Sequence, residues 1–211
     1  MADVNWSELY QQRKHIASRF GDIWAQPIEK RYSSVLARLA GPYMSVLEVG
    51  AGDRSLLEKL KGHEGLTYQS CDIDQSFPHE YAHIDDVEGQ FDLVCGFEVI
   101  EHMPLEAARH FLAQCYRVTS PGGIIMLTTP NIYYPPAFLR DATHITAFAF
   151  DELAGLLAMV GYEVTDIYRL YHDSLIKRFL RRFLFYGLFR LLGIDFSRQI
   201  MVVGKKLSQS A

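Results

Sequence analysis

Short apolar runs alternate with segments of helical periodicity along most of the chain. The runs predict buried strands, and the segments between them repeat apolar residues at helical spacing. Strands that alternate with long helices form βαβ units, so the sequence predicts an α/β fold: an open, mostly parallel sheet with helices on both faces. Ligands on such sheets bind at the carboxyl ends of the strands. The predicted strands are 46–49, 66–71, 91–97, 124–129, 163–170 and 199–206, and the predicted helices between them are 55–61, 105–118 and 150–160.

The residues before the first of these strands carry helical patterning. One apolar stripe recurs at helical spacing through Ile28, Tyr32, Val35, Leu36 and Leu39. We therefore expect an N-terminal helical cap over 1–44, followed by a main α/β domain over 45–207. A basic, amphipathic helical insertion is expected within that domain at about 174–194.

Composition narrows the class of protein. The chain has 211 residues, 49% of them hydrophobic, which is enough for one domain with a sizeable core. Its formal net charge is −4, whereas nucleic-acid-binding proteins usually carry an excess of positive charge, so no nucleic-acid partner is expected. Cys71, Cys95 and Cys115 are scattered without metal-ligand spacing, which predicts buried, reduced thiols. The sequence shows no secretory signal and no apolar run of about 20 residues, so we expect a cytoplasmic protein. It leaves the oligomeric state open.

The turn after the first predicted strand, VLEVGAGDRS, carries Gly50 and Gly52. Glycines at this point let the backbone approach a ligand, although an ordinary tight turn explains them as well. Ser55 stands where a dinucleotide fingerprint has its last glycine, which disfavours a nicotinamide cofactor. Asp72 follows the second strand, where a carboxylate can accept hydrogen bonds from ribose hydroxyls. Turn and acid together favour an adenosine-type ligand, with an NAD-dependent oxidoreductase as the alternative.

The chain resembles the class I S-adenosylmethionine-dependent methyltransferases in four motifs: Glu48-x-Gly50-x-Gly52, CDID, FDLVCGFEVIEHMP and VTSPGGIIMLTTPN. The resemblance runs from about Val46 to Lys205. It implies a Rossmann-like open sheet of the seven-stranded type, S-adenosylmethionine as the cofactor and methyl transfer as the activity. The chain departs from the family pattern at Asp53-Arg54, where many members carry a third glycine. It also has a short stretch between Asp74 and Phe91 in place of the usual helix and third strand.

The resemblance further implies which residues contact the cofactor. In that reading the glycines line its methionine end, acids hold its ribose and adenine amino group, and apolar side chains flank it. The residues are Glu48, which would orient the loop, Gly50, Gly52, Asp72 on the ribose, Ile73 on the adenine, Asp85 or Asp86 on the adenine amino group, and Phe97 at the border.

The stretch GFEVIEHMP packs two carboxylates and an imidazole into five residues after a buried strand. One interpretation is a pocket floor, with Phe97 and Glu98 beside the cofactor and Pro104 starting the next helix. The other is a divalent metal site. Glu-x-x-Glu-His with a later loop histidine resembles the metal set of small-RNA 2′-O-methyltransferases, and some ubiquinone-pathway O-methyltransferases look similar. The ligands that this resemblance implies are Glu98, Glu101, His102 and His144.

The two interpretations give these side chains different chemistry. Two carboxylates with two imidazoles suit Mn²⁺, Fe²⁺ or Zn²⁺ better than Mg²⁺. A bound ion would orient a substrate hydroxyl and lower its pKa. Without a metal, His144 or His102 is the candidate general base for a hydroxyl, since the pKa of imidazole lies near neutrality. An RNA substrate is not expected for this acidic chain.

Residues 174–194 combine an apolar stripe with a cluster of cations. The cations are Lys177, Arg178, Arg181 and Arg182, and the stripe is formed by Ile176, Phe179, Leu180, Phe183, Leu184, Leu188 and Leu191. A helix packed on the core explains the stripe. A peripheral membrane contact, or a lid over a greasy substrate, also explains the additional aromatic residues Phe185, Tyr186 and Phe189. The second interpretation favours O-methylation of a small or lipid-linked hydroxyl acceptor. A non-catalytic cofactor-binding module that docks on membranes is the remaining alternative.

Overall fold

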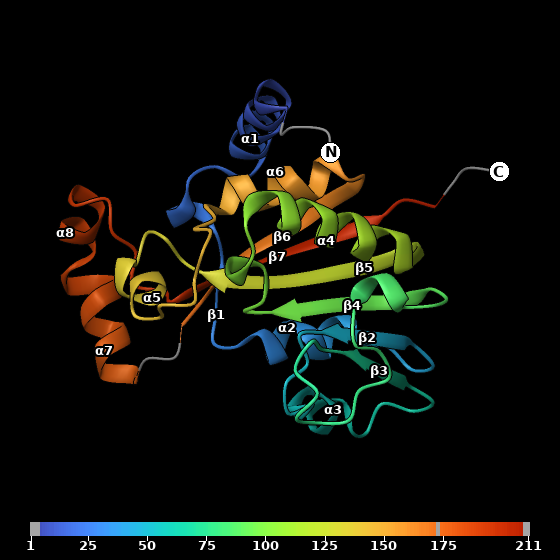
Figure 1. The fold of residues 1–211 in the computed structure, drawn as a ribbon. Helices are drawn as coiled ribbons and strands as arrows, with labels where there is room; N and C mark the ends of the chain where they lie inside the picture. Colours follow the sequence, from blue (N-terminus) through green and yellow to red (C-terminus); the bar gives the residue numbers. More distant parts are fainter. Residues whose placement is uncertain (1–4, 172–173, 209–211) are drawn as a thin grey trace.

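The computed structural model of the chain describes residues 5–171 and 174–208 (Figure 1). The strands are β1 (Ile28–Glu29), β2 (Ser45–Val49), β3 (Thr67–Cys71), β4 (Phe91–Phe97), β5 (Thr119–Pro130), β6 (Tyr162–Leu170) and β7 (Gln199–Lys206). The α-helices are α1 (Trp6–Phe20), α2 (Tyr32–Leu39), α3 (Ser55–Leu60), α4 (Leu105–Val118), α5 (Pro135–Leu139), α6 (Phe150–Met159), α7 (Leu175–Phe179) and α8 (Tyr186–Leu191). Short 3₁₀ turns lie at η1 (Ile23–Ala25), η2 (Ile84–Asp86) and η3 (Ile100–His102), and η4 (Leu180–Leu184) is a π-helical turn.

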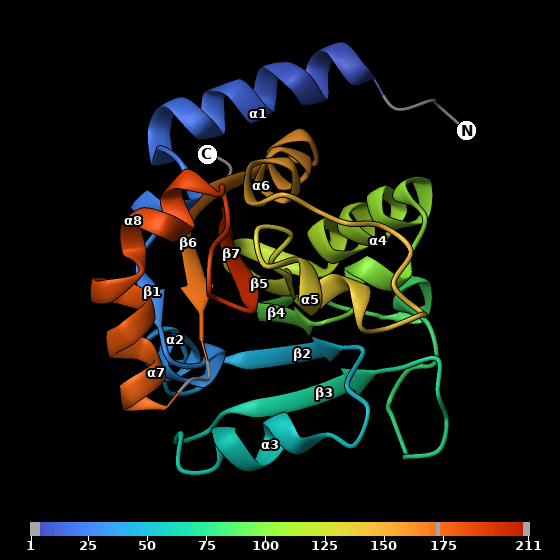
Figure 2. The same cartoon turned by 90° about the vertical axis from the view of Figure 1, so that its left-hand side faces the viewer.

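Within the described residues, seven strands form one sheet in the order β1-β6-β7-β5-β4-β2-β3. β7 runs antiparallel to both of its neighbours, and the other neighbouring pairs are parallel. Helices α1, α4 and α6 cover one face of the sheet, and α2 and α3 lie on the other (Figures 1 and 2). The predicted open, mostly parallel sheet with helices on both faces is therefore confirmed.

Each face of the sheet has its own hydrophobic core. Leu47 and Val94 belong to the core under α1, α4 and α6, whereas Val46 and Leu93 belong to the core against α2 and α3. Neighbouring residues of one strand point to opposite faces, so a strand covered on both faces reads as a continuous apolar run. The predicted reduced thiols are also confirmed: Cys71, Cys95 and Cys115 are buried and free.

The N-terminal segment differs from an all-helical cap at Ile28. This residue, which the sequence places on a helical stripe, lies in β1 and pairs in parallel with Arg169 of β6, and α2 begins only at Tyr32. Pro27 has no N–H to continue the preceding turn, and its carbonyl accepts a hydrogen bond of 2.8 Å from the Arg169 N–H. The segment therefore adds an edge strand to the sheet, while α1 packs against α6.

The stretch between β3 and β4 is as short as the sequence indicates. Besides the turn η2, the described structure has there an isolated bridge between Tyr81 and Cys71. The Tyr81 N–H donates to the Ser70 carbonyl, and the Tyr81 carbonyl accepts from the Asp72 N–H, each at 3.2 Å. These bonds hold the loop against the end of β3, where the sequence places a cofactor.

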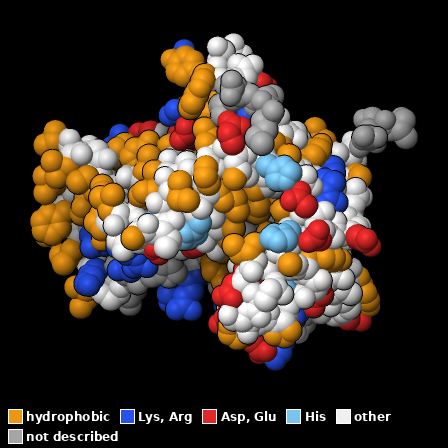
Figure 3. All heavy atoms as spheres, viewed as in Figure 1, with side chains coloured by type: hydrophobic (Ala, Val, Ile, Leu, Met, Phe, Trp, Pro, Cys, Tyr) orange, Lys and Arg blue, Asp and Glu red, His pale blue; other side chains and the backbone are white. Residues whose placement is uncertain are grey.

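The basic segment, residues 175–192, is not one helix but α7, η4 and α8 in succession. Its apolar stripe faces outward: Leu191 is 82% exposed, Ile176 74% and Phe183 67%. These exposures contradict the interpretation of the stripe as core packing. Figure 3 shows hydrophobic side chains gathered at the end of the molecule that carries α7 and α8, with Lys and Arg side chains beside them. Among the described helices, none is both long and apolar enough to span a bilayer.

Candidate functional site

The glycine turn between β2 and α3 is tied directly to the end of β3. Gly50 and Gly52 have φ angles of 71° and 47°, in the left-handed region that glycine adopts without strain. The Gly50 N–H donates to the Cys71 carbonyl at 2.8 Å, and the Gly52 N–H donates to the Asp72 carboxylate at 2.7 Å. Asp72 therefore fixes the turn as well as standing where a ribose is expected.

Glu48 lies under this turn rather than in a ligand space. Its side chain is buried and accepts a hydrogen bond from the Tyr68 hydroxyl. Burial raises the pKa of Glu48 to about 7, and the Tyr68 hydrogen bond opposes that rise. The loop-orienting role that the resemblance implies for Glu48 stays a prediction.

A hollow of about 490 Å³ opens beside the turn, at the carboxyl ends of β2, β3 and β4. Of the predicted cofactor residues, Gly50, Asp72, Ile73 and Asp85 line this hollow. Ile73 is 79% exposed, so it offers an apolar surface that a flat ring could cover. A carboxylate oxygen of Asp85 lies 2.7 Å from Nε2 of His110. We call this space the cofactor hollow.

The other predicted cofactor residues lie outside its lining: Glu48, Gly52, Asp86 and Phe97. Phe97 points to the opposite face of the sheet, where its ring stacks on Tyr32 with centroids 4.1 Å apart. A larger hollow of about 680 Å³, between α1, α4 and α6, has none of the predicted site residues on its lining.

Glu98 follows β4 in a backbone conformation that is strained for any residue other than glycine. Its φ is 58°, and its N–H donates to the Thr128 carbonyl at 3.2 Å and to the Thr128 hydroxyl at 3.1 Å. Burial raises the pKa of Glu98, and hydrogen bonds with the Gln199 and Thr128 side chains, followed by the nearby His144 and His102, partly offset that rise. The strained turn places Glu98 on the lining of the cofactor hollow and also of a second hollow.

The second hollow has a volume of about 320 Å³ and lies on the β5 and β7 side of Glu98. We call it the acceptor hollow. Its other lining residues are Tyr134, Pro136, Ala137, Arg140, Arg198 and Gln199, none of which the sequence singles out. One signal was available. Because β7 is antiparallel, residues just before it return to the edge where β4 and β5 end.

The histidines predicted for catalysis or metal binding lie together. The Glu101 carbonyl accepts hydrogen bonds from the Ile145 and Thr146 N–H groups, at 2.7 and 3.0 Å. This pairing draws the later loop onto η3, so that the rings of His102 and His144 lie 4.9 Å apart between centroids.

Backbone contacts define which ring nitrogen of each histidine is free. Nδ1 of His144 lies 2.8 Å from the Phe138 carbonyl, and Nδ1 of His102 lies 3.2 Å from the Thr143 carbonyl. A carbonyl only accepts, so each Nδ1 donates in these contacts, and in a neutral ring the lone pair then lies on Nε2; Nε2 of His144 also lies 3.9 Å from the Asp141 carboxylate. Both rings can therefore act as a base or as a metal ligand through Nε2.

Glu101 is the buried carboxylate beside this pair. It has no exposed surface, and neither carboxylate oxygen has a hydrogen-bond partner in the described structure. Burial and then the nearby Glu98 raise the pKa of Glu101 to about 8. Ligand atoms of Glu101, His102 and His144 all lie within 4.8 Å of one another, and Glu98 is not part of that group.

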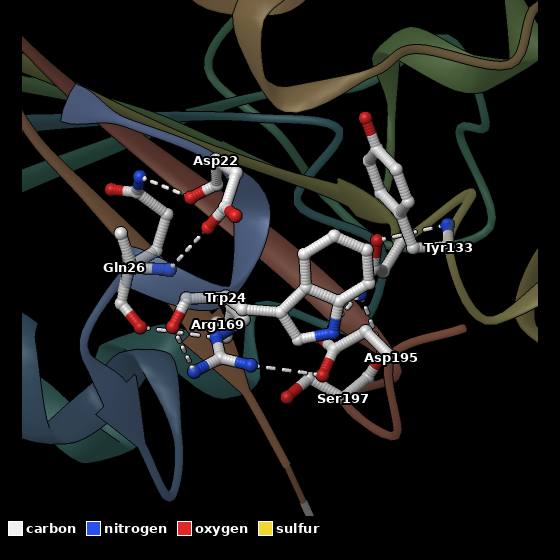
Figure 4. Close-up of polar contacts among 9 residues, drawn as sticks. Asp22, Trp24, Gln26, Tyr133, Arg169, Asp195 and Ser197 are labelled. Atoms are coloured by element: carbon white, nitrogen blue, oxygen red, sulfur yellow. Dashed lines mark hydrogen bonds and ion pairs between the residues drawn. The ribbon is translucent and has the colours of Figure 1, made fainter. Parts of the chain in front are cut away.

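A buried polar network holds the walls of the acceptor hollow (Figure 4). Arg169 pairs with Asp195 at 2.9 Å and also donates to the carbonyls of Gln26 and Trp24. The Asn131 amide donates to Asp195 and to the Ser197 carbonyl, each at 2.9 Å. One wall follows Asn131 and the other follows Ser197, so the network fixes both.

A sheet in this order, with a glycine turn after β2 and an acid at the end of β3, defines a class I S-adenosylmethionine-dependent methyltransferase. Comparison with known proteins leads to the same class. A family model described as a methyltransferase domain matches residues 24–167, and the chain belongs to that family. This result sets aside the NAD-dependent alternative.

Named relatives match this chain over only part of their own length. A probable S-adenosylmethionine-dependent methyltransferase of Mycolicibacterium smegmatis is 29% identical over 170 residues, 72% of this chain and 63% of the relative. A ubiquinone biosynthesis O-methyltransferase of Psychrobacter arcticus is 30% identical over 172 residues, 64% of this chain and 65% of the relative. The chain therefore spans less than two thirds of the length of these relatives.

Solved structures share the fold at low identity. A SAM-dependent methyltransferase from Archaeoglobus fulgidus superimposes with a TM-score of 0.63 at 16% identity, covering 96% of this chain and all of that one. A Burkholderia thailandensis 1,6-didemethyltoxoflavin-N1-methyltransferase, solved with bound 1,6-didemethyltoxoflavin and S-adenosylhomocysteine, superimposes with a TM-score of 0.58 at 17% identity, covering 99% of this chain and 92% of that one. The likeness shows the fold of the chain, not its acceptor.

Proposed function

We propose that this chain transfers the methyl group of S-adenosylmethionine to a hydroxyl of a small or lipid-linked acceptor. One observation carries the proposal: two hollows meet at Glu98, and one of them holds the cofactor residues Gly50 and Asp72. A cofactor in the first hollow and an acceptor in the second would lie on opposite sides of one strand end. The O-methyltransferase name of the Psychrobacter arcticus relative, at 30% identity, supports oxygen as the atom methylated.

Methyl transfer needs alignment more than activation, because the sulfonium already carries the reactivity. The bond from the methyl carbon to sulfur breaks as its bond to the acceptor oxygen forms, and the hydroxyl proton passes to a base. His102 is exposed, lines the cofactor hollow and keeps its Nε2 lone pair, so it is our candidate base. The His144 side chain is only 7% exposed, which suits a supporting position.

The test is release of S-adenosylhomocysteine with hydroxyl compounds and with amines of matched shape. We expect methylated hydroxyl products, identified by mass spectrometry, and a fall of about 10²–10⁴ in kcat for His102→Ala. His15→Ala, at an exposed histidine on α1, is the matched control. Methylation of the amines alone would contradict an oxygen acceptor. Cofactor binding without turnover of any acceptor would favour the non-catalytic module.

A divalent metal at Glu101, His102 and His144 is the second candidate feature of this site. The residues fit a metal: a fully buried carboxylate without hydrogen-bond partners in the described structure lies beside two imidazoles, with ligand atoms of all three residues within 4.8 Å of one another. A bound ion would supply charge that orients the acceptor hydroxyl and lowers its pKa. The donor set, one carboxylate and two imidazoles, suits Mn²⁺, Fe²⁺ or Zn²⁺.

Calorimetric titration of chelator-treated protein with Mn²⁺, after saturation with S-adenosylhomocysteine, tests the metal directly. We expect one-to-one binding that is lost in Glu101→Gln and kept in Glu88→Gln, a change at an exposed acid. If the wild-type protein binds no Mn²⁺, Fe²⁺ or Zn²⁺, the three side chains serve as pocket floor and base.

The basic segment supports a peripheral membrane contact, which bears on a lipid-linked acceptor. Its outward apolar side chains stand beside Lys177, Arg181 and Arg182 in a chain whose formal net charge is −4. An amphipathic surface with cations on it suits an anionic lipid headgroup region. In Figure 1 this segment and α5, a wall of the acceptor hollow, lie at the same end of the molecule.

Vesicle flotation tests this contact. We expect flotation with phosphatidylglycerol vesicles but not with phosphatidylcholine vesicles, and loss of it when Lys177, Arg181 and Arg182 are changed to Gln. Changing three exposed cations elsewhere, Lys14, Lys30 and Arg31, to Gln controls for net charge. Equal flotation of both triple variants would contradict a contact through this segment.

A further inference from the structure

We propose that the acceptor hollow recognises an anionic group of the methyl acceptor, a carboxylate or a phosphate, through Arg140 and Arg198. The inference rests on the proposed function, in which the acceptor occupies this hollow. It adds the chemical class of the acceptor: a hydroxyl compound that carries an acidic group.

The first support is position. Arg140 follows α5 and Arg198 precedes β7, so two segments far apart in the sequence bring guanidinium-bearing residues to one space of about 320 Å³. Glu98 separates this space from the cofactor hollow. A ligand held on the arginine side would therefore extend its other end toward Glu98 and the cofactor.

The second support is charge without compensation. Many arginines of the chain are paired, for example Arg38 with Glu29 and Arg54 with Glu80, each at 2.8 Å. By contrast, Arg140 and Arg198 are exposed, and their side chains have no hydrogen-bond or ion-pair partner among residues 5–171 and 174–208. Two like charges on the lining of one hollow together attract an anion.

Glu98 does not neutralise these two charges. It is the acid on the described lining, and it forms no ion pair with Arg140 or Arg198 in the described structure. The hollow is therefore electropositive toward a ligand. The Tyr134 hydroxyl, which has no partner in the described structure, adds one more donor on the lining.

The third support is rigidity. The Asn131 amide donates a hydrogen bond of 2.9 Å to Asp195 of the buried network, and these two residues lie shortly before the two walls. The Tyr133 N–H donates to the Asn131 side chain, and the Asn131 N–H donates to the Arg198 carbonyl at 2.9 Å. A backbone held in this way loses little freedom when a ligand binds.

The ligand chemistry follows from the guanidinium group. Its planar fork of N–H donors matches the paired oxygens of a carboxylate or of a phosphate. A volume of about 320 Å³ is at the lower end for ligand sites, so it suits a compound of about one ring with its substituents. The hydroxyl to be methylated would lie on the Glu98 side and the anion on the arginine side.

Calorimetry with defined probes tests the proposal. Protein saturated with S-adenosylhomocysteine is titrated with benzoate, with phenyl phosphate and with uncharged benzamide. We expect saturable one-to-one binding of an anionic probe, weakened by added salt, and no comparable binding of benzamide. Whether benzoate or phenyl phosphate binds more tightly identifies which anion the acceptor carries, and a clear preference for either supports the proposal.

Arg140→Gln and Arg198→Gln should each lower the affinity for the anionic probe about tenfold or more, since a charge-assisted hydrogen bond is lost. The Lys variants at the same positions should lose less, because they keep the charge without the fork. Arg31→Gln, at an exposed arginine outside both hollows, should change nothing. Circular dichroism and S-adenosylhomocysteine affinity show that each variant remains folded.

The outcomes separate this inference from the proposed function. Binding of S-adenosylhomocysteine without saturable binding of either anion overturns the anion subsite alone. Anion binding that neither Gln variant weakens, or benzamide binding as tight as benzoate, overturns it too. Anion binding that both variants weaken supports the subsite even if no hydroxyl compound is methylated, a result that would count against the proposed function instead.

Discussion

Replacing Gly50 with alanine would perturb the turn over the cofactor hollow in two separable ways. The φ angle of Gly50 is 71°, which an L side chain adopts only at a cost in free energy. A Cβ at this position would also lie 2.3 Å from Cγ2 of Val99, far inside van der Waals contact. Val99 lines the cofactor hollow, so the clash reaches the site itself.

The two costs can be given rough sizes. The left-handed conformation costs about 1–2 kcal/mol for a residue with a Cβ, and forcing an extra methyl into a packed position costs about 1–3 kcal/mol. Gly52 is the matched control: its φ is 47°, and a Cβ there would meet no heavy atom within 4 Å. Gly52→Ala should therefore lose only the conformational part, and Gly50→Ala both.

Urea unfolding of Gly50→Ala, Gly52→Ala, Val99→Ala and the Gly50→Ala/Val99→Ala pair measures these free energies as a double-mutant cycle. Val99→Ala removes the methyl groups that clash, so the pair should be more stable than the sum of its single changes predicts, by about 1–3 kcal/mol. The affinity for S-adenosylhomocysteine should fall in Gly50→Ala and recover in part in the pair.

Two results would refute this reasoning. Equal loss of stability in Gly50→Ala and Gly52→Ala would mean that the Val99 contact is relieved at no cost. Additivity within the cycle would mean that Val99 is not the side chain that a Cβ at Gly50 meets.

Three further predictions concern acids of the site and its support. Asp72→Asn removes the charge that accepts from the Gly52 N–H and that we propose binds the ribose hydroxyls; it should weaken the binding of S-adenosylhomocysteine about tenfold in calorimetry, and unchanged affinity would contradict the ribose role. Asp195→Asn should cost about 3–5 kcal/mol in urea unfolding, because it leaves the buried Arg169 charge unpaired. Glu29→Gln, at the more exposed pair with Arg38, should cost under about 1 kcal/mol, and equal losses would contradict that contrast. Burial raises the pKa of Glu48 from 4.5 to about 7, so the folded protein holds a proton that the unfolded chain loses. The free energy of unfolding should therefore fall by about 1–3 kcal/mol as pH rises from 4.5 to 7, relative to Glu48→Gln, and parallel pH profiles of the two would refute it.

Local patterns account for what the sequence predicted correctly. The central strands were recognisable because burial on both faces demands continuous apolar runs, as at Val46 and Leu93. Gly50 and Asp72 line one hollow, and the sequence could place them together because each directly follows its strand and parallel strands end at one edge. Each of these inferences needs only a few neighbouring residues.

Long-range pairing accounts for the features that the sequence pattern could not predict. β1 has two residues, too few for a periodicity, and it exists because Arg169 of β6 bonds the Pro27 carbonyl. Arg140 and Arg198 line the same hollow because β7 is antiparallel and a buried network joins the loops before them. The exposure of the basic segment is likewise a property of the assembled molecule, since a stripe such as that through Phe183 looks the same whether it faces a core or water.

The free-energy costs at the end of β4 indicate that this stretch serves ligand binding rather than the stability of the fold. Glu98 holds a left-handed backbone that glycine would adopt without strain, and Glu101 buries a carboxylate with no partner in the described structure. The strain and the unpartnered carboxylate both raise the free energy of the folded chain, and neither acid caps α4, whose N-cap residue is Pro104 without a side-chain cap. Both costs fall where the two hollows meet beside His102, and a bound cofactor, acceptor or cation is what could offset them. The charge in GFEVIEHMP is therefore better explained by what the strand end binds than by what it caps.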